Sequence, residues 1–145
     1  MKLFTIGFTQ KSAEYFFETL RTAGVVRVVD VRLNNASQLA GFSKKSDLQY
    51  FLRVIAGIDY VHAPALAPTQ EMLDAYKKRK GAWPAYEQEF IDLMQSRQVE
   101  SSCREVVAEG SCLLCSEHLP DHCHRRVVTD YLQRHWQDVS VEHLV

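Results

Sequence analysis

The side chains of this chain that are suited to chemistry gather in residues 111–128, SCLLCSEHLPDHCHRRVV. Cysteine, histidine and glutamate are the residue types of nucleophilic, acid–base and metal chemistry. Cys112–Cys115 is short and apolar like a buried parallel strand, and apolar residues recur at helical spacing from Val127 onward. We therefore expect Glu117–Arg125 to lie where a strand passes into a helix, and open α/β sheets bind ligands at that edge.

The start of this helix has the features of an anion site. A helix that begins at Cys123 or His124 presents free backbone N–H groups and a partial positive charge. Arg125 and Arg126 add positive charge at the same place. Arg32 follows an earlier strand, and its planar guanidinium group suits a phosphate or a carboxylate. These five residues are our candidate anion ligands.

Two carboxylates, Asp30 and Glu117, are candidates for a general acid or base. Each follows or ends a predicted strand, so each could reach a pocket at the sheet edge. In the alternative interpretation, one of them pairs with Arg32, Arg125 or Arg126 and holds the strand ends together.

Cys115 is the candidate nucleophile, because helix N-termini and neighbouring arginines both favour a thiolate. The outline is similar to rhodanese and cysteine-phosphatase domains, in which a cysteine ends a strand and an arginine-bearing loop leads to a helix. Arg125 lies ten residues after Cys115, too far for the tight anion cradle of those families, and Glu117 would oppose a thiolate. A small cysteine that fills core space is the structural alternative.

Metal binding is a further hypothesis. Cysteine and histidine side chains suit zinc, and Glu117 could act as a ligand or as a general base. Cys112 and Cys115 do not form a zinc knuckle, because on a strand they point to opposite faces. We therefore assign no metal ligands, and zinc stays an unfavoured alternative. The residues concerned are Cys115, His118, His122, Cys123 and His124.

Composition limits the class of protein. The 145 residues, 46% of them hydrophobic, suffice for one core, and we expect a single domain over residues 1–145. The sequence contains neither an apolar run of about 20 residues nor a secretory signal, which indicates a cytoplasmic protein without a membrane partner. Its four cysteines would then be free thiols. The basic run at residues 77–80 could steer a polyanion, or could be a solvated helix end.

Apolar periodicity indicates alternating strands and helices around a long loop at residues 33–46. Ser46 is expected to cap the helix that follows this loop. The expected strands are Leu3–Ile6, Val25–Val31, Ile58–His62, Cys112–Cys115 and Val139–Leu144. The expected helices are Ser12–Ala23, Asp47–Ala56, Gln70–Arg79, Tyr86–Ser96, Glu100–Glu109 and approximately His124–His135.

This alternation predicts a three-layer α/β sandwich with a mostly parallel five-stranded sheet. We expect the strand order 3-2-1-4-5, with the first and fourth strands side by side. The carboxyl ends of the strands would then share one edge, where Thr5 and Tyr60 would border the pocket and Gly7 would belong to the anion site. The residues brought to this edge are Thr5, Gly7, Asp30, Arg32, Tyr60, Cys115 and Glu117.

With these strand ends defined, the chain resembles the family called domain of unknown function 488. The resemblance covers essentially the whole chain and rests on the motifs TIGF, VVDVR, a loop that ends in GF, GIDY, LLCSE and CHRR. It implies a cytoplasmic α/β domain of bacteria or archaea, and it brings no established reaction with it.

We interpret the chain as a cytoplasmic protein with an anion-binding pocket that could be catalytic. The expected ligand is a phosphate-bearing small molecule, a nucleotide or a nucleic-acid end. One alternative is a non-catalytic nucleic-acid-binding module that uses the basic run and the 33–46 loop. Another is a thiol-dependent enzyme of sulfur or phosphoryl transfer. The sequence leaves the cofactor, the substrate and the oligomeric state open.

Overall fold

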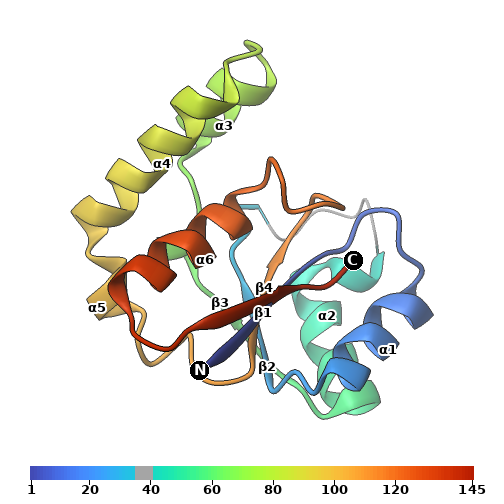
Figure 1. The fold of residues 1–145 in the computed structure, drawn as a ribbon. Coiled ribbons are helices and arrows are strands. Elements are labelled where there is room, and N and C mark those ends of the chain that lie inside the picture. The colour runs from blue at the N-terminus through green and yellow to red at the C-terminus, as the bar shows by residue number, and fades with distance from the viewer. Residues whose placement is uncertain (35–40) are drawn as a thin grey trace.

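A single five-stranded sheet organises the protein, and the computed structural model describes it over residues 1–34 and 41–145 (Figure 1). All neighbouring strands pair in parallel, as the alternation of strands and helices predicts. The strands are β1 (Lys2–Gly7), β2 (Arg27–Asp30), β3 (Asp59–His62), β4 (Ser111–Cys115) and β5 (Ser140–His143).

The strand order is β3-β2-β4-β1-β5, so the expected order 3-2-1-4-5 is wrong at its third and fourth positions, which are exchanged. The first and fourth strands are neighbours as expected, but β4 lies between β2 and β1. Every residue of β4 is buried, and a strand this apolar is most stable where other strands and both helical layers cover it. The register pairs Gly7 with Cys115, so β1 and β4 end together.

Helices cover both faces of the sheet. Crossovers between parallel strands are nearly always right-handed, so the chain's reversal of direction after β3 changes the face on which its helices lie. Figure 1 shows α1 and α2 on one side of the sheet and α6, with the α3–α4 pair beyond it, on the other. In the described part of the chain, no helix is long and apolar enough to cross a membrane. The helices are α1 (Ala13–Ala23), α2 (Lys45–Phe51), α3 (Gln70–Lys77), α4 (Trp83–Arg97), α5 (Val99–Ser102) and α6 (His124–His135).

Several helix boundaries differ from the expected ones. Helix α2 begins directly after Lys44, so Ser46 lies inside it and is not its cap; α2 continues as a π-helical turn, Leu52–Ala56. Helix α4 begins at Trp83 because the following proline fits the first turn of a helix. The helix expected at Glu100–Glu109 is reduced to α5. Within the expected loop at 33–46, a short 3₁₀ turn occupies 41–43, and residues 35–40 lie outside the described residues.

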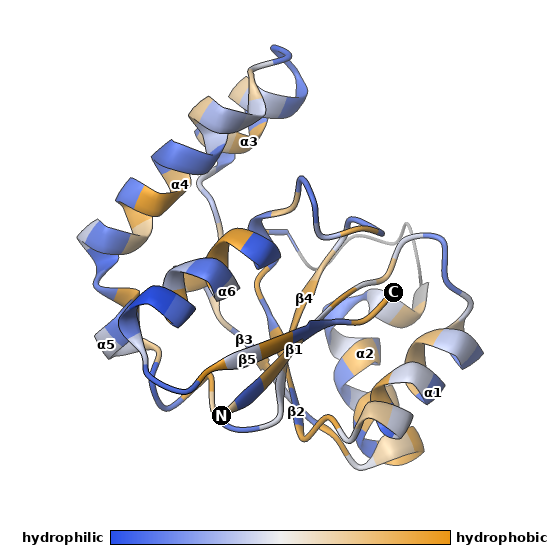
Figure 2. Cartoon of the chain, in the orientation of Figure 1, coloured by the Kyte–Doolittle hydropathy of each residue, from blue (hydrophilic) through white to orange (hydrophobic). Residues whose placement is uncertain are grey.

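The alternation of side chains along β4 determines which layer each one contacts. Leu113 and Cys115 belong to the core on the α4 and α6 side, whereas Cys112 and Leu114 belong to the core on the α1 and α2 side. Figure 2 shows the apolar character of the central strands between the more polar outer faces of the helices. Cys115 is thus directed towards the layer that contains α6.

Gly7, at the end of β1, allows the loop after β4 to pass very close to the strand. A Cβ atom at this position would lie 1.5 Å from the backbone oxygen of Glu117 and 2.8 Å from Nη1 of Arg125. Only a residue without a side chain fits here.

We expect Gly7→Ala to lower the free energy of unfolding by about 3 kcal/mol, because the added methyl group must push β1 away from the loop. Urea denaturation measures the effect. Gly24→Ala is the control, since its methyl group would meet open space and adds only the strain of a positive φ, about 1 kcal/mol. An equal loss of unfolding free energy in the two variants would show that the close approach of the loop to Gly7 does not exclude a side chain.

Candidate active site

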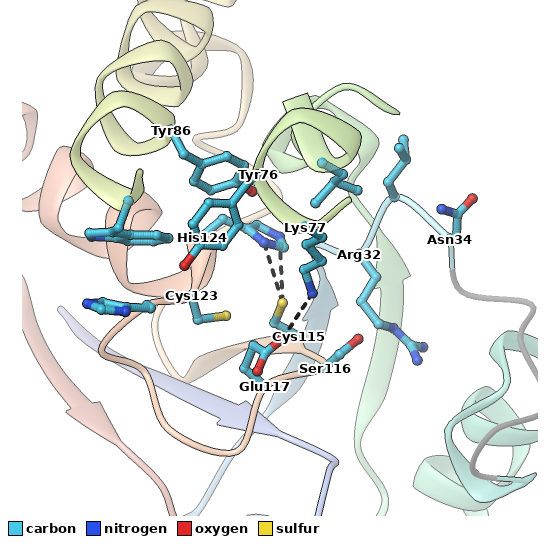
Figure 3. A pocket seen from close by; sticks show the side chains of 14 residues that line it. Arg32, Asn34, Tyr76, Lys77, Tyr86, Cys115, Ser116, Glu117, Cys123 and His124 are labelled. Atoms are coloured by element: carbon cyan, nitrogen blue, oxygen red, sulfur yellow. Dashed lines mark hydrogen bonds and ion pairs between the residues drawn. The ribbon is translucent and has the colours of Figure 1, made fainter. Parts of the chain in front are cut away.

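A cavity of about 150 Å³ opens at the carboxyl ends of β2 and β4 (Figure 3). One wall consists of the end of β4 and the start of α6, with the side chains of Cys115, Cys123 and His124. The opposite wall belongs to the α3–α4 pair and carries Tyr76 and Tyr86. The pocket therefore lies at the sheet edge where the sequence predicted one.

Cys115 and His124 form a thiol–imidazole pair at this wall. The sulfur of Cys115 lies 3.4 Å from Nδ1 of His124, and Nε2 of the same ring lies 2.7 Å from the carbonyl oxygen of Val31. A carbonyl oxygen only accepts hydrogen bonds, so Nε2 carries the proton and Nδ1 of the neutral ring is unprotonated. The sulfur also lies 3.8 Å from Nε2, so it sits beside Nδ1 and off its lone-pair axis. Burial lowers the pKa of His124 and so favours this neutral form.

The surroundings of the Cys115 sulfur stabilise its negative form. A hydrogen bond from Cys123 lowers the pKa of Cys115 and outweighs burial, which acts in the opposite direction. The backbone N–H groups of Ser116 and Glu117 also hydrogen-bond to the sulfur, and the charge of Arg125 adds to their effect. The pKa of Cys115 is therefore lower than that of an ordinary cysteine, whereas burial raises the pKa of Cys112.

Glu117 lines the pocket, and its carboxylate is paired with a lysine. Its Oε1 atom lies 3.0 Å from Nζ of Lys77 in a half-exposed ion pair. The expected opposition of Glu117 to a Cys115 thiolate is thus offset, because Lys77 neutralises the carboxylate while the backbone N–H of Glu117 supports the thiolate.

Asp30 acts as a buried anchor for Arg32. Its carboxylate oxygens accept hydrogen bonds of 2.8 Å from Nε and from Nη2 of Arg32 and one of 2.6 Å from the hydroxyl of Tyr60. Arg32 also donates to the carbonyl of Ser43 at 2.7 Å. Arg32 reaches the pocket wall, but Asp30 and Tyr60 do not line it. This arrangement matches the alternative interpretation, in which Asp30 pairs with an arginine and holds the strand ends together.

Alternation along β2 explains this separation. Asp30 lies two residues after Val28, which faces the α1 and α2 side, whereas Cys115 faces the α6 side. The strand ends share an edge, but their side chains point to different layers.

Arg125 supports the loop after β4. Its side chain is fully buried and donates to the carbonyl oxygens of Glu117, at 2.5 Å, and of His118, at 3.1 Å. Nη1 also lies 3.5 Å from the sulfur of Cys123. Gly7 contributes the space that this loop needs. Both residues are therefore placed to shape the wall of the pocket rather than to contact a ligand within it.

Two other predicted site residues lie outside the pocket. Arg126 forms ion pairs with Glu87, at 2.6 Å, and with Asp130, at 2.5 Å, and so joins α6 to α4. The hydroxyl of Thr5 lies 2.6 Å from Nδ1 of His143, towards β5. Neither residue is among those that line the cavity.

One group of potential metal ligands is present among the described residues. The ligand atoms of Cys115, Cys123 and His124 all lie within 4.8 Å of one another. Their types suit zinc, and three protein ligands with one open position are typical of catalytic zinc sites. His118 and His122 lie outside this group; His118 contacts Lys11, and the ring of His122 stacks on Trp83.

The aromatic wall was missed by the sequence interpretation. Tyr76 and Tyr86 stack with ring centroids 4.8 Å apart, and Trp83 packs against both. The periodicity indicated two helices around a turn and did not single out these rings. The recurrence of aromatic residues on both sides of the turn, at 76, 83 and 86, was the available signal.

The fold and the site define an α/β protein with a buried thiol–imidazole pair at the carboxyl edge of a parallel sheet. A family model described as "domain of unknown function DUF488" matches residues 12–132, so the chain belongs to that family. Searches of curated proteins and of solved structures yield no match.

Replacing the buried carboxylate tests the role of Asp30. Burial would raise its pKa, but the hydrogen bonds and charge of Arg32 outweigh burial and leave the pKa below its ordinary value. The carboxylate therefore stabilises the native state above the unfolded pKa of about 3.9, and this contribution disappears as the pH falls through the native pKa. We expect Asp30→Asn to lose about 3 to 5 kcal/mol at neutral pH and to lose less stability than the wild type on acidification.

Denaturation curves between neutral and acid pH measure both effects. Glu18→Gln is the matched control, because it removes a carboxylate from an exposed ion pair and should leave stability unchanged. Wild-type stability in Asp30→Asn would contradict the role of Asp30 as a buried anchor.

Proposed function

We propose that this protein is a thiol-dependent transferase that moves a sulfur atom from a small anionic donor, with Cys115 as the nucleophile. The observation that carries the proposal is the 3.4 Å contact between the Cys115 sulfur and Nδ1 of a His124 ring whose tautomer Val31 sets. Covalent catalysis generally uses a nucleophile, a base that activates it, and a third group that orients the base.

The size of the cavity supports a small substrate. Its volume of about 150 Å³ is similar to that of a cavity which holds benzene, and is below the roughly 300 Å³ at which pockets for larger ligands begin. A thiosulfate-sized anion suits this space better than a whole nucleotide does. Lys77 lines the cavity together with its ion-pair partner Glu117.

The arginines favour sulfur transfer over phosphoryl transfer. Phosphoryl transfer needs cationic groups directed at the transferred phosphate. Arg32 is engaged by Asp30 and Ser43, and Arg125 by the carbonyl groups of the loop after β4. A sulfane sulfur atom, in contrast, needs mainly a thiolate and room for the leaving group.

The reaction follows from this geometry. His124 accepts the thiol proton at Nδ1, and the Cys115 thiolate attacks the outer sulfur of the donor. A new S–S bond forms on Cys115, the S–S bond of the donor breaks, and sulfite leaves with the electron pair when thiosulfate is the donor. The backbone N–H groups of Ser116 and Glu117 are placed to stabilise negative charge on the cysteine. An acceptor such as cyanide then removes the outer sulfur as thiocyanate and restores the thiolate.

We expect thiosulfate to add one sulfur atom to Cys115 and cyanide to remove it, as measured by intact and peptide mass spectrometry. Cys115→Ser should load no sulfur. His124→Asn, which retains a polar group near the Nδ1 position but accepts no proton, should slow loading by about 100-fold. Cys103→Ser is the control and should behave as the wild type, because Cys103 is buried away from the pocket.

The outcomes separate the candidate chemistries. In one outcome, the wild type loads no sulfur but hydrolyses p-nitrophenyl phosphate, with no hydrolysis by Cys115→Ser. That result would show phosphoryl transfer in place of sulfur transfer. A Cys115 that reacts with neither thiosulfate nor iodoacetamide in the folded protein would refute the thiol mechanism.

A further inference from the structure

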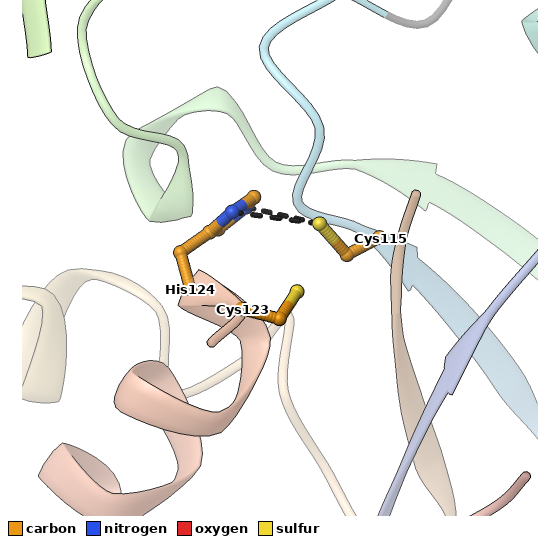
Figure 4. Close-up of side chains that lie close together, drawn as sticks. All are labelled: Cys115, Cys123 and His124. Atoms are coloured by element: carbon orange, nitrogen blue, oxygen red, sulfur yellow. Dashed lines mark hydrogen bonds between the residues drawn. The ribbon is translucent and has the colours of Figure 1, made fainter. Parts of the chain in front are cut away.

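A second thiol lines the pocket, and the proposed transfer does not use it as a nucleophile. Cys123 lines the cavity beside Cys115, and its sulfur lies within 4.8 Å of the Cys115 sulfur. Figure 4 shows the two sulfur atoms and the His124 ring converging from the end of β4 and the start of α6. The other two cysteines, Cys103 and Cys112, do not line this cavity.

The two sulfur atoms are not equivalent. Cys115 ends β4, and its sulfur lies 3.4 Å from Nδ1 of His124. Cys123 directly precedes α6, and its sulfur lies 3.5 Å from Nη1 of Arg125. Cys115 is thus the thiol next to the imidazole, and Cys123 is its neighbour in the same pocket.

The local backbone allows the two sulfurs to approach each other. A disulfide requires an S–S distance of about 2.05 Å, so the sulfurs must move closer together. Cys123 precedes the first turn of α6 in an extended conformation, at the end of the loop 116–122. Residues of a loop and a helix cap shift more readily than residues inside a strand or a helix.

We propose that Cys115 and Cys123 form a redox-active dithiol in which Cys123 resolves the sulfenic acid that a hydroperoxide forms on Cys115. The inference rests on Cys115 being the nucleophile of the proposed function. It assigns Cys123 as a second catalytic residue and hydroperoxides as a further class of substrate.

The chemistry balances in two steps. The Cys115 thiolate attacks the hydroperoxide, an S–O bond forms, the O–O bond breaks, and the departing oxygen takes up a proton to leave as an alcohol, or as water from hydrogen peroxide. Cys123 then attacks the sulfur of the sulfenic acid. The S–S bond forms, the S–O bond breaks, and the thiol proton of Cys123 leaves with the hydroxide as water. The two thiols supply the two electrons that reduce the peroxide, and an external dithiol restores them.

Equimolar hydrogen peroxide, added to reduced full-length protein freed of metal by a chelator, tests the proposal. We expect an intramolecular Cys115–Cys123 disulfide by peptide mapping, reversible by dithiothreitol. In Cys123→Ser, a Cys115 sulfenic acid that dimedone traps should persist at least about 10-fold longer, because an adjacent thiol acts at an effective concentration near millimolar. Cys103→Ser is the matched control and should form the same disulfide as the wild type.

Two results would overturn the inference: a sulfenic acid of equal lifetime in the wild type and in Cys123→Ser, or a disulfide that involves Cys103 or Cys112. If Cys115 still accepts sulfur from thiosulfate in that case, the resolving role alone fails. If Cys115 reacts with neither peroxide nor thiosulfate nor iodoacetamide, the proposed function fails as well.

Discussion

The hydrogen bond between Nε2 of His124 and the carbonyl oxygen of Val31 is the interaction on which the site depends. It joins the first residue of α6 to the backbone just after β2, across the end of β4. Because the carbonyl fixes the tautomer, Nδ1 is left unprotonated, 3.4 Å from the Cys115 sulfur. A rotation of the ring, or a shift of α6 along the sheet, would remove the base from the sulfur.

The topology makes this contact available. With β4 between β2 and β1, the end of β4 has β2 on one side and β1 on the other, and α6 begins above it. Arg125 hydrogen-bonds to the loop after β4, and Gly7 allows this loop to pass close to β1. The buried ion pair of Asp30 and Arg32 stabilises the end of β2. Buried charged side chains thus support the strand ends around the pocket, and the thiols, the imidazole and the aromatic rings form much of its lining.

The sequence predicted the class of fold, the parallel sheet and the segment that carries the pocket, because these follow from local apolar patterns. It did not predict that β4 separates β1 from β2, since the order of strands depends on pairing between distant segments. It grouped Asp30 with Cys115 because both lie near strand ends, but alternation directs them to opposite layers. The sequence predicted that Arg125 binds the anion. In the structure its side chain is buried and donates to carbonyl groups of the loop after β4. The contact between Cys115 and His124 depends on how α6 is rotated about its axis. The spacing of residues along the chain does not specify this rotation.

Titration of thiolate absorbance in the ultraviolet, for the wild type and for Cys115→Ser, tests the central claim most directly. The account predicts that the folded wild type contains a thiolate that titrates below the ordinary cysteine pKa of about 8.5, and that this titration disappears in Cys115→Ser. Absorbance that rises only above this pH in the folded wild type, or an unchanged low-pH titration in Cys115→Ser, would contradict it.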